Sequence, residues 1–141
     1  MPAAKTYDPK KVNLIVGAII VTGFAKGTFI NAEYAEDLYK IMVGSDGETT
    51  RVRNNDRHGV VTITLHNTSQ SNGTLTALKQ LDDASEQGKV PIFLRDNSGL
   101  DVAGSPEGWI AKMPGFKRGD DVENVEWVLH CRDFEPVLGG N

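Results

Sequence analysis

Apolar and polar residues alternate along two segments of the chain, and each alternation predicts a β-strand. In residues 61–66 the odd-numbered positions are Val, Ile and Leu, and in residues 124–132 they are Val, Trp, Leu and Cys. A shorter alternation over 90–94 predicts a third strand, and Pro91 places its start or a sheet edge there, because proline cannot donate to a ladder. The pattern therefore favours a protein built mainly from strands.

Three further segments are predicted as strands on weaker patterns. Residues 12–22 are apolar on both faces except at Asn13 and Gly17, which is typical of one buried strand with a kink at the glycine. A glycine ends that run, and residues 24–30 form the next predicted strand. Residues 34–43 fit both a helical face and a two-residue alternation, and we favour the strand.

One segment has helical periodicity. Leu75, Leu78 and Leu81 recur every three residues, and serine and threonine side chains just before them can cap a helix N-terminus. Gly88 stands where a helix C-terminal glycine belongs. We therefore predict a helix over residues 71–87.

Two long polar stretches separate these elements. Residues 44–58 are predicted to form a charged loop, and residues 106–119 form a second irregular region that Trp109 and Met113 would anchor. Loops of this length are uncommon in small domains and are often functional. The whole pattern predicts a β-sandwich or flattened barrel with one flanking helix, in a single domain over residues 1–141 that begins with an N-terminal arm over 1–11.

Composition limits the functions that this fold could serve. The chain has 141 residues, with 15 lysines and arginines against 19 aspartates and glutamates, so its net charge is −4. An acidic balance disfavours proteins that grip nucleic acid phosphates. The one cysteine, Cys131, excludes an internal disulfide and a cysteine-based zinc site. The apolar runs are too short to cross a membrane, so we expect a soluble protein made in a reducing cytoplasm.

The sequence offers no constellation for catalysis, metal binding or a cofactor. His58, His66 and His130 have no metal-ligand spacing among them. His130 stands beside Cys131, but neighbouring residues of a strand point to opposite faces, so we expect the thiol in the core and the imidazole outside. We therefore expect a protein without enzymatic activity, metal or cofactor.

The basic residues of the predicted loop are the clearest candidate for function. Arg51, Arg53 and Arg57 could contact nucleic acid, or they could dock onto carboxylates of a neighbouring copy. The net negative charge favours self-association over phosphate binding. Candidate acidic partners lie at positions 82, 83, 120, 121 and 123.

The order of the motifs resembles a family of phage structural proteins similar to the tail tube proteins of long-tailed bacteriophages. A strand over 41–47 ends in Gly-x-Asp-Gly, and after a charged loop come an alternating strand over 59–65 and a Thr-Ser-x-x-Asn helix start at 68–72. The likeness continues through 90–96 and 110–114 to the strand around Trp127, covering about residues 7–139.

This resemblance implies a subunit of six-membered rings that stack into a hollow tube, through which the genome passes during ejection. It implies a place in the virion tail, most similar to contractile tails, after assembly in the host bacterial cytoplasm. The implied partners are further copies of the chain and sheath, tape-measure, baseplate and tail-terminator proteins, while DNA passes without specific binding and no membrane is involved. The alternatives are a tube protein of a secretion system or phage-derived bacteriocin, or a small soluble ligand-binding or enzymatic β-domain.

Two sets of residues are expected to serve such an assembly. The predicted contacts between subunits lie on the arm and on the charged loop: Tyr7, Lys10, Lys11, Asp46, Arg51, Arg53 and Arg57. Carboxylates lining a conduit would repel DNA and let it slide. The predicted acids of the lumen are Glu33, Glu36, Asp101 and Glu123.

Overall fold

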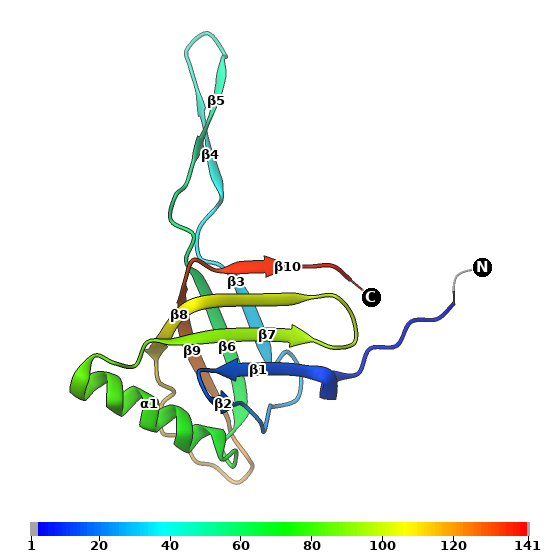
Figure 1. Cartoon of the computed structure of the whole chain (residues 1–141), viewed down its shortest axis with the longest axis vertical. Helices are drawn as coiled ribbons and strands as arrows, with labels where there is room; N and C mark the ends of the chain where they lie inside the picture. Colours follow the sequence, from blue (N-terminus) through cyan, green and yellow to red (C-terminus); the bar gives the residue numbers. More distant parts are fainter. Residues whose placement is uncertain (1–2, 141) are drawn as a thin grey trace.

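The computed structural model describes residues 3–140, so residues 1–2 of the predicted arm and residue 141 lie outside the described residues (Figure 1). The described chain forms ten strands, one α-helix and one short 3-10 turn, η1 (Pro9–Lys11). The remaining elements are β1 (Val12–Val16), β2 (Ile19–Ile20), β3 (Ile30–Tyr34), β4 (Tyr39–Val43), β5 (Thr49–Arg53), β6 (Gly59–His66), α1 (Ser71–Ser85), β7 (Val90–Asp96), β8 (Val102–Lys112), β9 (Asn124–Arg132) and β10 (Glu135–Val137).

Eight of the strands form one antiparallel sheet in the order β2-β1-β7-β8-β9-β6-β3, and β10 pairs with the start of β8. Strand β8 joins two halves of this sheet, because its first part pairs with β7 and β10 and its last part pairs with β9. The strands of the two halves run in clearly different directions (Figure 1). The predicted mainly β fold with one flanking helix is confirmed, and its two layers are halves of one folded sheet.

The core lies between these halves. The alternation over β6 and β9 is confirmed, since Val61, Ile63 and Leu65 are fully buried and Trp127 and Leu129 face them. The predicted helix is also confirmed over 71–85. Helix α1 is tied to the sheet at its N-terminal end, where the Trp127 Nε1 donates to Asn72 Oδ1 at 2.9 Å.

The end of the helix differs from the prediction. Glu86, with φ of 59°, takes the left-handed position that a glycine usually occupies. Gly88 serves a different purpose, because its backbone N–H donates to the Asp82 carboxylate and a Cβ there would overlap that side chain.

The prediction of one kinked strand over 12–22 is wrong. Gly17, with φ of 62°, lies in a two-residue turn that reverses the chain, so that Val16 pairs with Ile19 and Ile15 with Ile20. Apolar residues on both faces of the run reflect two adjacent strands. The left-handed conformation at Gly17 makes the reversal possible.

The strand predicted over 24–30 is also absent. Phe24 makes one isolated bridge to Leu65, and the chain then turns at Gly27, where φ is 94°. Strand β3 begins only at Ile30. The strand predicted over 34–43 is divided, because β3 ends at Tyr34 and β4 begins at Tyr39.

The irregular region predicted over 106–119 is shorter than expected. Strand β8 continues through Pro106 to Lys112, and only residues 113–123 are irregular. The register with β7 shifts between Ile92 and Val90, which accommodates the proline next to Ser105. The Ser105 hydroxyl contacts the backbone carbonyls of Glu107 and of Arg132 in β9. These contacts hold the part of β8 around Pro106 in place.

Two glycine substitutions test the packing of this fold. A Cβ at Gly59 would overlap the ring of buried Phe134, whereas a Cβ at Gly73 on the exposed side of α1 would meet nothing. We expect Gly59→Ala to lower the free energy of unfolding by about 1–3 kcal/mol through overpacking. The matched Gly73→Ala should raise it by about 0.5–1 kcal/mol. Urea denaturation curves measure both, and equal midpoints for the two variants would contradict this packing.

Candidate assembly interface

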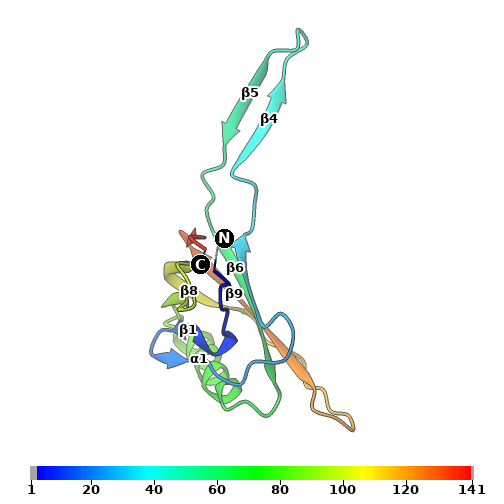
Figure 2. The ribbon, with the colours of Figure 1, turned by 90° about the vertical axis from the view of Figure 1, so that its right-hand side faces the viewer.

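A two-stranded hairpin projects from the body of the domain along its long axis (Figures 1 and 2). It consists of β4 and β5, so the loop predicted over 44–58 is corrected, because residues 49–53 form a strand that pairs with Tyr39–Val43. The sequence did contain a signal for it. Two five-residue segments with strand-forming residues flank a five-residue connection, 44–48, that contains Asp-Gly, and this spacing is typical of a hairpin.

Asp46 belongs to the tip of this hairpin. Its Oδ1 accepts a hydrogen bond from the Glu48 backbone N–H at 3.1 Å, and Gly47 adopts a φ of 85°. The backbone closes the turn, since Gly44 N–H donates to the Glu48 carbonyl at 2.8 Å. The carboxylate of Asp46 thus shapes the tip and remains exposed there.

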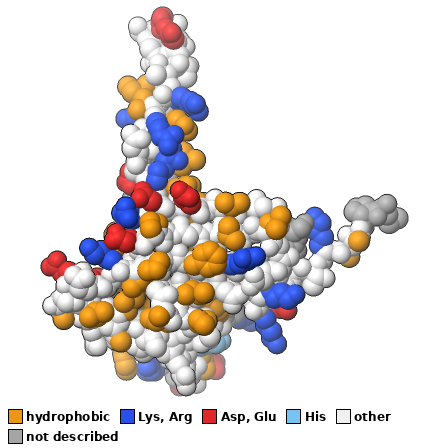
Figure 3. Space-filling model, in the orientation of Figure 1, with side chains coloured by type: hydrophobic (Ala, Val, Ile, Leu, Met, Phe, Trp, Pro, Cys, Tyr) orange, Lys and Arg blue, Asp and Glu red, His pale blue; other side chains and the backbone are white. Residues whose placement is uncertain are grey.

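The shaft of the hairpin carries apolar side chains on both faces. The register pairs Ile41 with Arg51 on one face and Met42 with Thr50 on the other. Ile41 is 71% exposed and Met42 is 57% exposed, and Figure 3 shows apolar and basic side chains along the projection. An isolated two-stranded hairpin is only marginally stable in water, and three or more strands or a packed apolar face are needed to stabilise it. The exposed apolar side chains of this hairpin therefore mark it as a surface that another polypeptide could cover.

Two of the predicted arginines lie together on one face of the hairpin. The Arg51 guanidinium stacks over the Tyr39 ring at 4.2 Å, and Arg53 Nη1 donates to the Tyr39 hydroxyl at 3.3 Å. The hydrogen bond from Arg53, and then the charges of Arg51 and Arg53, lower the pKa of Tyr39. The result is a cationic surface held in a fixed arrangement by an aromatic ring.

Arg57 does not belong to this surface. It lies at the root of the hairpin, where its Nε donates to the Asn54 carbonyl at 2.9 Å and its own carbonyl accepts from the Phe134 N–H at 3.0 Å. Beside it, His58 Nδ1 and Asp56 Oδ1 are 2.6 Å apart. This hydrogen bond, with a second from the His58 backbone, lowers the pKa of Asp56. Hydrogen bonds of polar groups therefore hold the root of the hairpin against the body.

The N-terminal arm forms a separate surface. Asp8 caps the η1 turn by accepting from the Lys10 N–H at 3.0 Å, and its backbone N–H donates to Ser98 Oγ at 3.1 Å. The side chains of Tyr7, Lys10 and Lys11 are exposed. Figure 1 shows the arm leaving the body at β1, away from the hairpin, so the structure does not bring the two predicted contact sets together.

The four predicted lumen acids lie on four different segments. Glu33 points outward from β3, Glu36 lies in the connection to the hairpin, and Glu123 precedes β9. Asp101 lies in the β7–β8 turn, where its Oδ1 accepts from the Gly140 N–H at 2.8 Å. Only Glu33 lies on the outer face of a main-sheet strand.

That outer face of β3, β6 and β9 contains a residue which the sequence analysis missed. Glu126 is exposed and pairs with Thr64, while Thr62 pairs with Asn31 of β3. The alternation of β9 was sufficient to find it, because Glu126 stands next to buried Trp127 and must face outward. The register places these polar and acidic side chains on the same face as the half-buried Val60, Val128 and His130.

The structure also describes the groups considered for catalysis. Cys131 is fully buried, and this burial raises the pKa of its thiol to about 11. His58 and His130 lie with ring centroids 5.9 Å apart, and the described residues contain no group of three or more potential metal-ligating side chains. An open cavity of about 450 Å³ between β3 and β7 is lined mainly by apolar residues. Within residues 3–140, no helix has the length and apolarity that a membrane crossing requires.

Comparison with known proteins places these features in context. The family described as "Bacteriophage PhiTE tail tube protein" matches residues 16–139. The "Structural protein ORF10" of Pseudomonas phage KPP10 is 29% identical over 144 residues, which cover 96% of this chain and 83% of that protein.

Solved structures with a similar fold come from contractile injection systems. The sheath/tube terminator of the extracellular system PVC has a TM-score of 0.59 at 10% identity, over 97% of this chain and all of that chain. The anti-feeding prophage tube-terminating cap has a TM-score of 0.61 at 10% identity, over 97% and 94%. A chain of the PVC sheath-tube complex has a TM-score of 0.58 at 11% identity, over 94% and 91%. At these identities the likeness concerns the fold.

The arrangement around Tyr39 is testable by its ionisation. Because the arginines favour the phenolate, its midpoint should lie below the usual value of about 10, and Arg53→Gln should raise it. Ultraviolet absorbance of the wild type minus that of Tyr39→Phe, followed against pH, isolates this tyrosine. Lys40→Gln on the opposite hairpin face is the control and should change the midpoint less. An unshifted midpoint in Arg53→Gln would exclude the hydrogen bond.

Proposed function

The chain belongs to the bacteriophage PhiTE tail tube protein family, and from this premise we propose that its copies form hexameric rings which stack into a hollow conduit for the genome. The chain is a structural phage tail protein and thus a component of the virion. The proposal adds the ring, the stack, the passage of DNA during ejection and assembly in the host bacterial cytoplasm. It assigns the chain no enzymatic activity.

The exposed hairpin is the observation that carries this proposal. A packed body would gain nothing from a projecting pair of strands with apolar residues on both faces, unless another polypeptide covers them. A neighbouring copy in the next ring is the cover that we propose. The cationic face of Arg51 and Arg53 then meets carboxylates of that copy, while Tyr7, Lys10 and Lys11 of the arm make a second contact.

The sheet edges support a closed ring. Among the described residues, β3 pairs only with β6 in the main sheet, and β2 pairs only with β1. Each edge presents unpaired backbone groups that a neighbouring copy can pair with. A head-to-tail contact of this kind makes rings when the rotation closes, and a further contact between unlike surfaces stacks them.

We assign the outer face of β3, β6 and β9 to the lumen. Its carboxylates, Glu33 and Glu126, would repel phosphates, and its threonines offer no cation to retain them. Glu36 and Glu123 lie near this face by their places in the chain and remain secondary candidates. Asp101 is a weaker candidate, because its carboxylate already accepts a hydrogen bond near the C-terminal end of the described chain.

A tube terminator is the second candidate for the place of this subunit in the tail. Two of the similar structures are named as a tube terminator and a tube-terminating cap, and they match 97% of this chain. A terminator would cap a tube, whereas a tube subunit would polymerise by itself. Sheath, tape-measure, baseplate and terminator proteins are the further partners that we propose. A tube of a secretion system or bacteriocin would share the architecture, and the phage relative favours a phage.

Charge reversal on the hairpin tests the stacking. We expect Arg51→Glu/Arg53→Glu to give a folded subunit that no longer polymerises, because the cationic face then repels its acidic partner. Electron microscopy of the purified protein measures tube length, and circular dichroism checks the fold. Lys26→Glu, a charge reversal on an exposed loop of the body, is the control and should still form tubes. Tubes of normal length from the double variant would remove this face from the interface, and a wild type that stays monomeric at high concentration would favour a small soluble β-domain.

The lumen assignment predicts an effect on DNA release. In phage that carries Glu126→Lys, we expect normal tails but slower ejection at low salt, because lysines on the conduit wall would hold phosphates. Added salt should restore the rate by screening this attraction. Glu86→Lys at the end of α1 is the matched control. Ejection at the wild-type rate in low salt would place Glu126 outside the lumen.

A further inference from the structure

A groove lies where the hairpin meets the body, and we call it the elbow groove. Arg53 and Arg57 form the side toward the hairpin, Phe93 and Val137 form the floor, and Glu135 lies on the side of β10. The groove has a volume of about 780 Å³. Acidic and basic side chains gather at the base of the hairpin in Figure 3.

The floor of the elbow groove is an apolar sheet surface without a covering layer. Phe93 is 44% exposed and Val137 is 55% exposed, although both belong to paired strands. Gly104 lies between Phe93 and Glu135 in the register and leaves space above the backbone. A large apolar side chain from another molecule could fill this space.

The charges around the groove are available to a partner. Among the described residues, neither Glu135 nor the two arginines form an ion pair, whereas Asp133 nearby is already 3.0 Å from Arg132. The groove therefore presents a carboxylate on one side and two guanidinium groups on the other. Each guanidinium donates one hydrogen bond, to the Tyr39 hydroxyl or the Asn54 carbonyl, and keeps further N–H groups for a partner.

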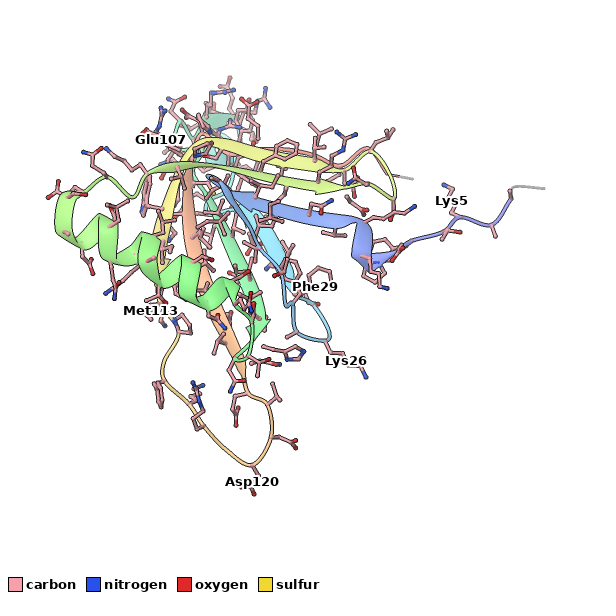
Figure 4. All side chains as sticks on the ribbon, turned by 60° about the horizontal axis from the view of Figure 1, so that its bottom comes forward. Lys5, Lys26, Phe29, Glu107, Met113 and Asp120 are labelled. Carbon is pink, nitrogen blue, oxygen red and sulfur yellow. The ribbon has the colours of Figure 1, made fainter. Side chains whose placement is uncertain are left out.

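The opposite end of the molecule carries the matching surface. The irregular segment 113–123, which we call the distal loop, projects from the end that lies away from the hairpin (Figures 1 and 2). Figure 4 shows Met113 and Asp120 along this loop, and Glu107 in the middle of β8 lies well away from it. Phe116 is 87% exposed, which is unusual for an aromatic side chain of this size.

The distal loop carries an exposed aromatic ring and both kinds of charge that could complement the groove. The Arg118 guanidinium lies over the Phe116 ring at 4.4 Å, and Lys117 stands between them in the chain. Two exposed aspartates follow at positions 120 and 121. The exposed phenylalanine is thus followed in the chain first by two cations and then by two carboxylates.

We propose that the distal loop of one copy docks into the elbow groove of a copy in the adjacent ring. Phe116 would cover Phe93 and Val137, Arg118 would pair with Glu135, and the aspartates would face the groove's arginines. The inference rests on the proposed function, because it requires stacked copies. The two surfaces differ and lie at opposite ends, so each contact leaves a free loop and a free groove, and the stack can continue.

Charge reversal with rescue tests the proposed pair. Arg118→Glu alone and Glu135→Arg alone should each lower the polymerised fraction about tenfold, because each places like charges together. The two changes combined in one chain should restore most of it. Sedimentation measures the polymer, and native mass spectrometry measures the rings, which should persist in all three variants. Glu86→Arg, a reversal on α1, is the control and should polymerise normally. Normal polymerisation of both single variants, or a combined variant no better than either, would overturn the proposal.

Cross-linking identifies the occupant of the groove. A Phe116→Cys/Val137→Cys variant should form intermolecular disulfides under mild oxidation of assembled tubes, with little background because Cys131 is buried. The matched Met42→Cys/Val137→Cys variant should not. Disulfides in the second variant alone would show that a neighbour's hairpin fills the groove and would overturn the inference. Wild-type protein that forms neither rings nor tubes would instead overturn the proposed function itself.

Discussion

A β-sheet has two faces, and each apolar face must be covered by other side chains or remain exposed to water. In this domain the core covers one face of the main sheet, and parts of the other face remain uncovered. The inward residues of β1, β6, β7 and β9 pack against each other across the fold, and α1 closes part of its side. Nothing within the described chain covers the outer face at Phe93 or either face of the hairpin. The stability of the domain comes from its core, while its function depends on the surfaces that the core leaves uncovered.

The hairpin and the elbow groove follow from the same topological choice. The chain leaves the sheet between β3 and β6, which are neighbours, and so it must return to the point where it left. A hairpin returns the chain to this point and pairs its own backbone groups on the way. Where the hairpin meets the outer face of β7, β8 and β10, the two surfaces form a concave angle. In this protein a projecting element and a concave site therefore arise together.

The sequence predicted what local side-chain periodicity determines. Residues 61–66 and 124–132 alternate because one face is buried, and 71–85 shows the helical period, so these elements were found. The turn at Gly17 was missed because two adjacent apolar strands have the same composition as one longer strand. Strand β5 was missed because both its faces are exposed, so Thr49–Arg53 has no apolar alternation to detect.

The sequence indicated which residues are candidates for contacts between subunits, but it did not show which of them lie together on one surface. The arginine-rich segment stood out by charge, but the separation of Arg57 from Arg51 and Arg53 depends on a strand ending at position 53. Phe116 could not be distinguished from a core residue by sequence, since its exposure results from a loop that passes outside the fold.

The way in which the hairpin joins the body also has a mechanical consequence. Its two strands continue from β3 and β6, which run roughly along the same direction as the hairpin (Figure 2). Hydrogen bonds between antiparallel strands lie across the strand direction. Tension applied along the hairpin therefore pulls β3 and β6 in the same direction and loads the bonds between β6 and β9 together, in shear, so that they do not open one after another. Such an attachment resists pulling far better than a peeling geometry would.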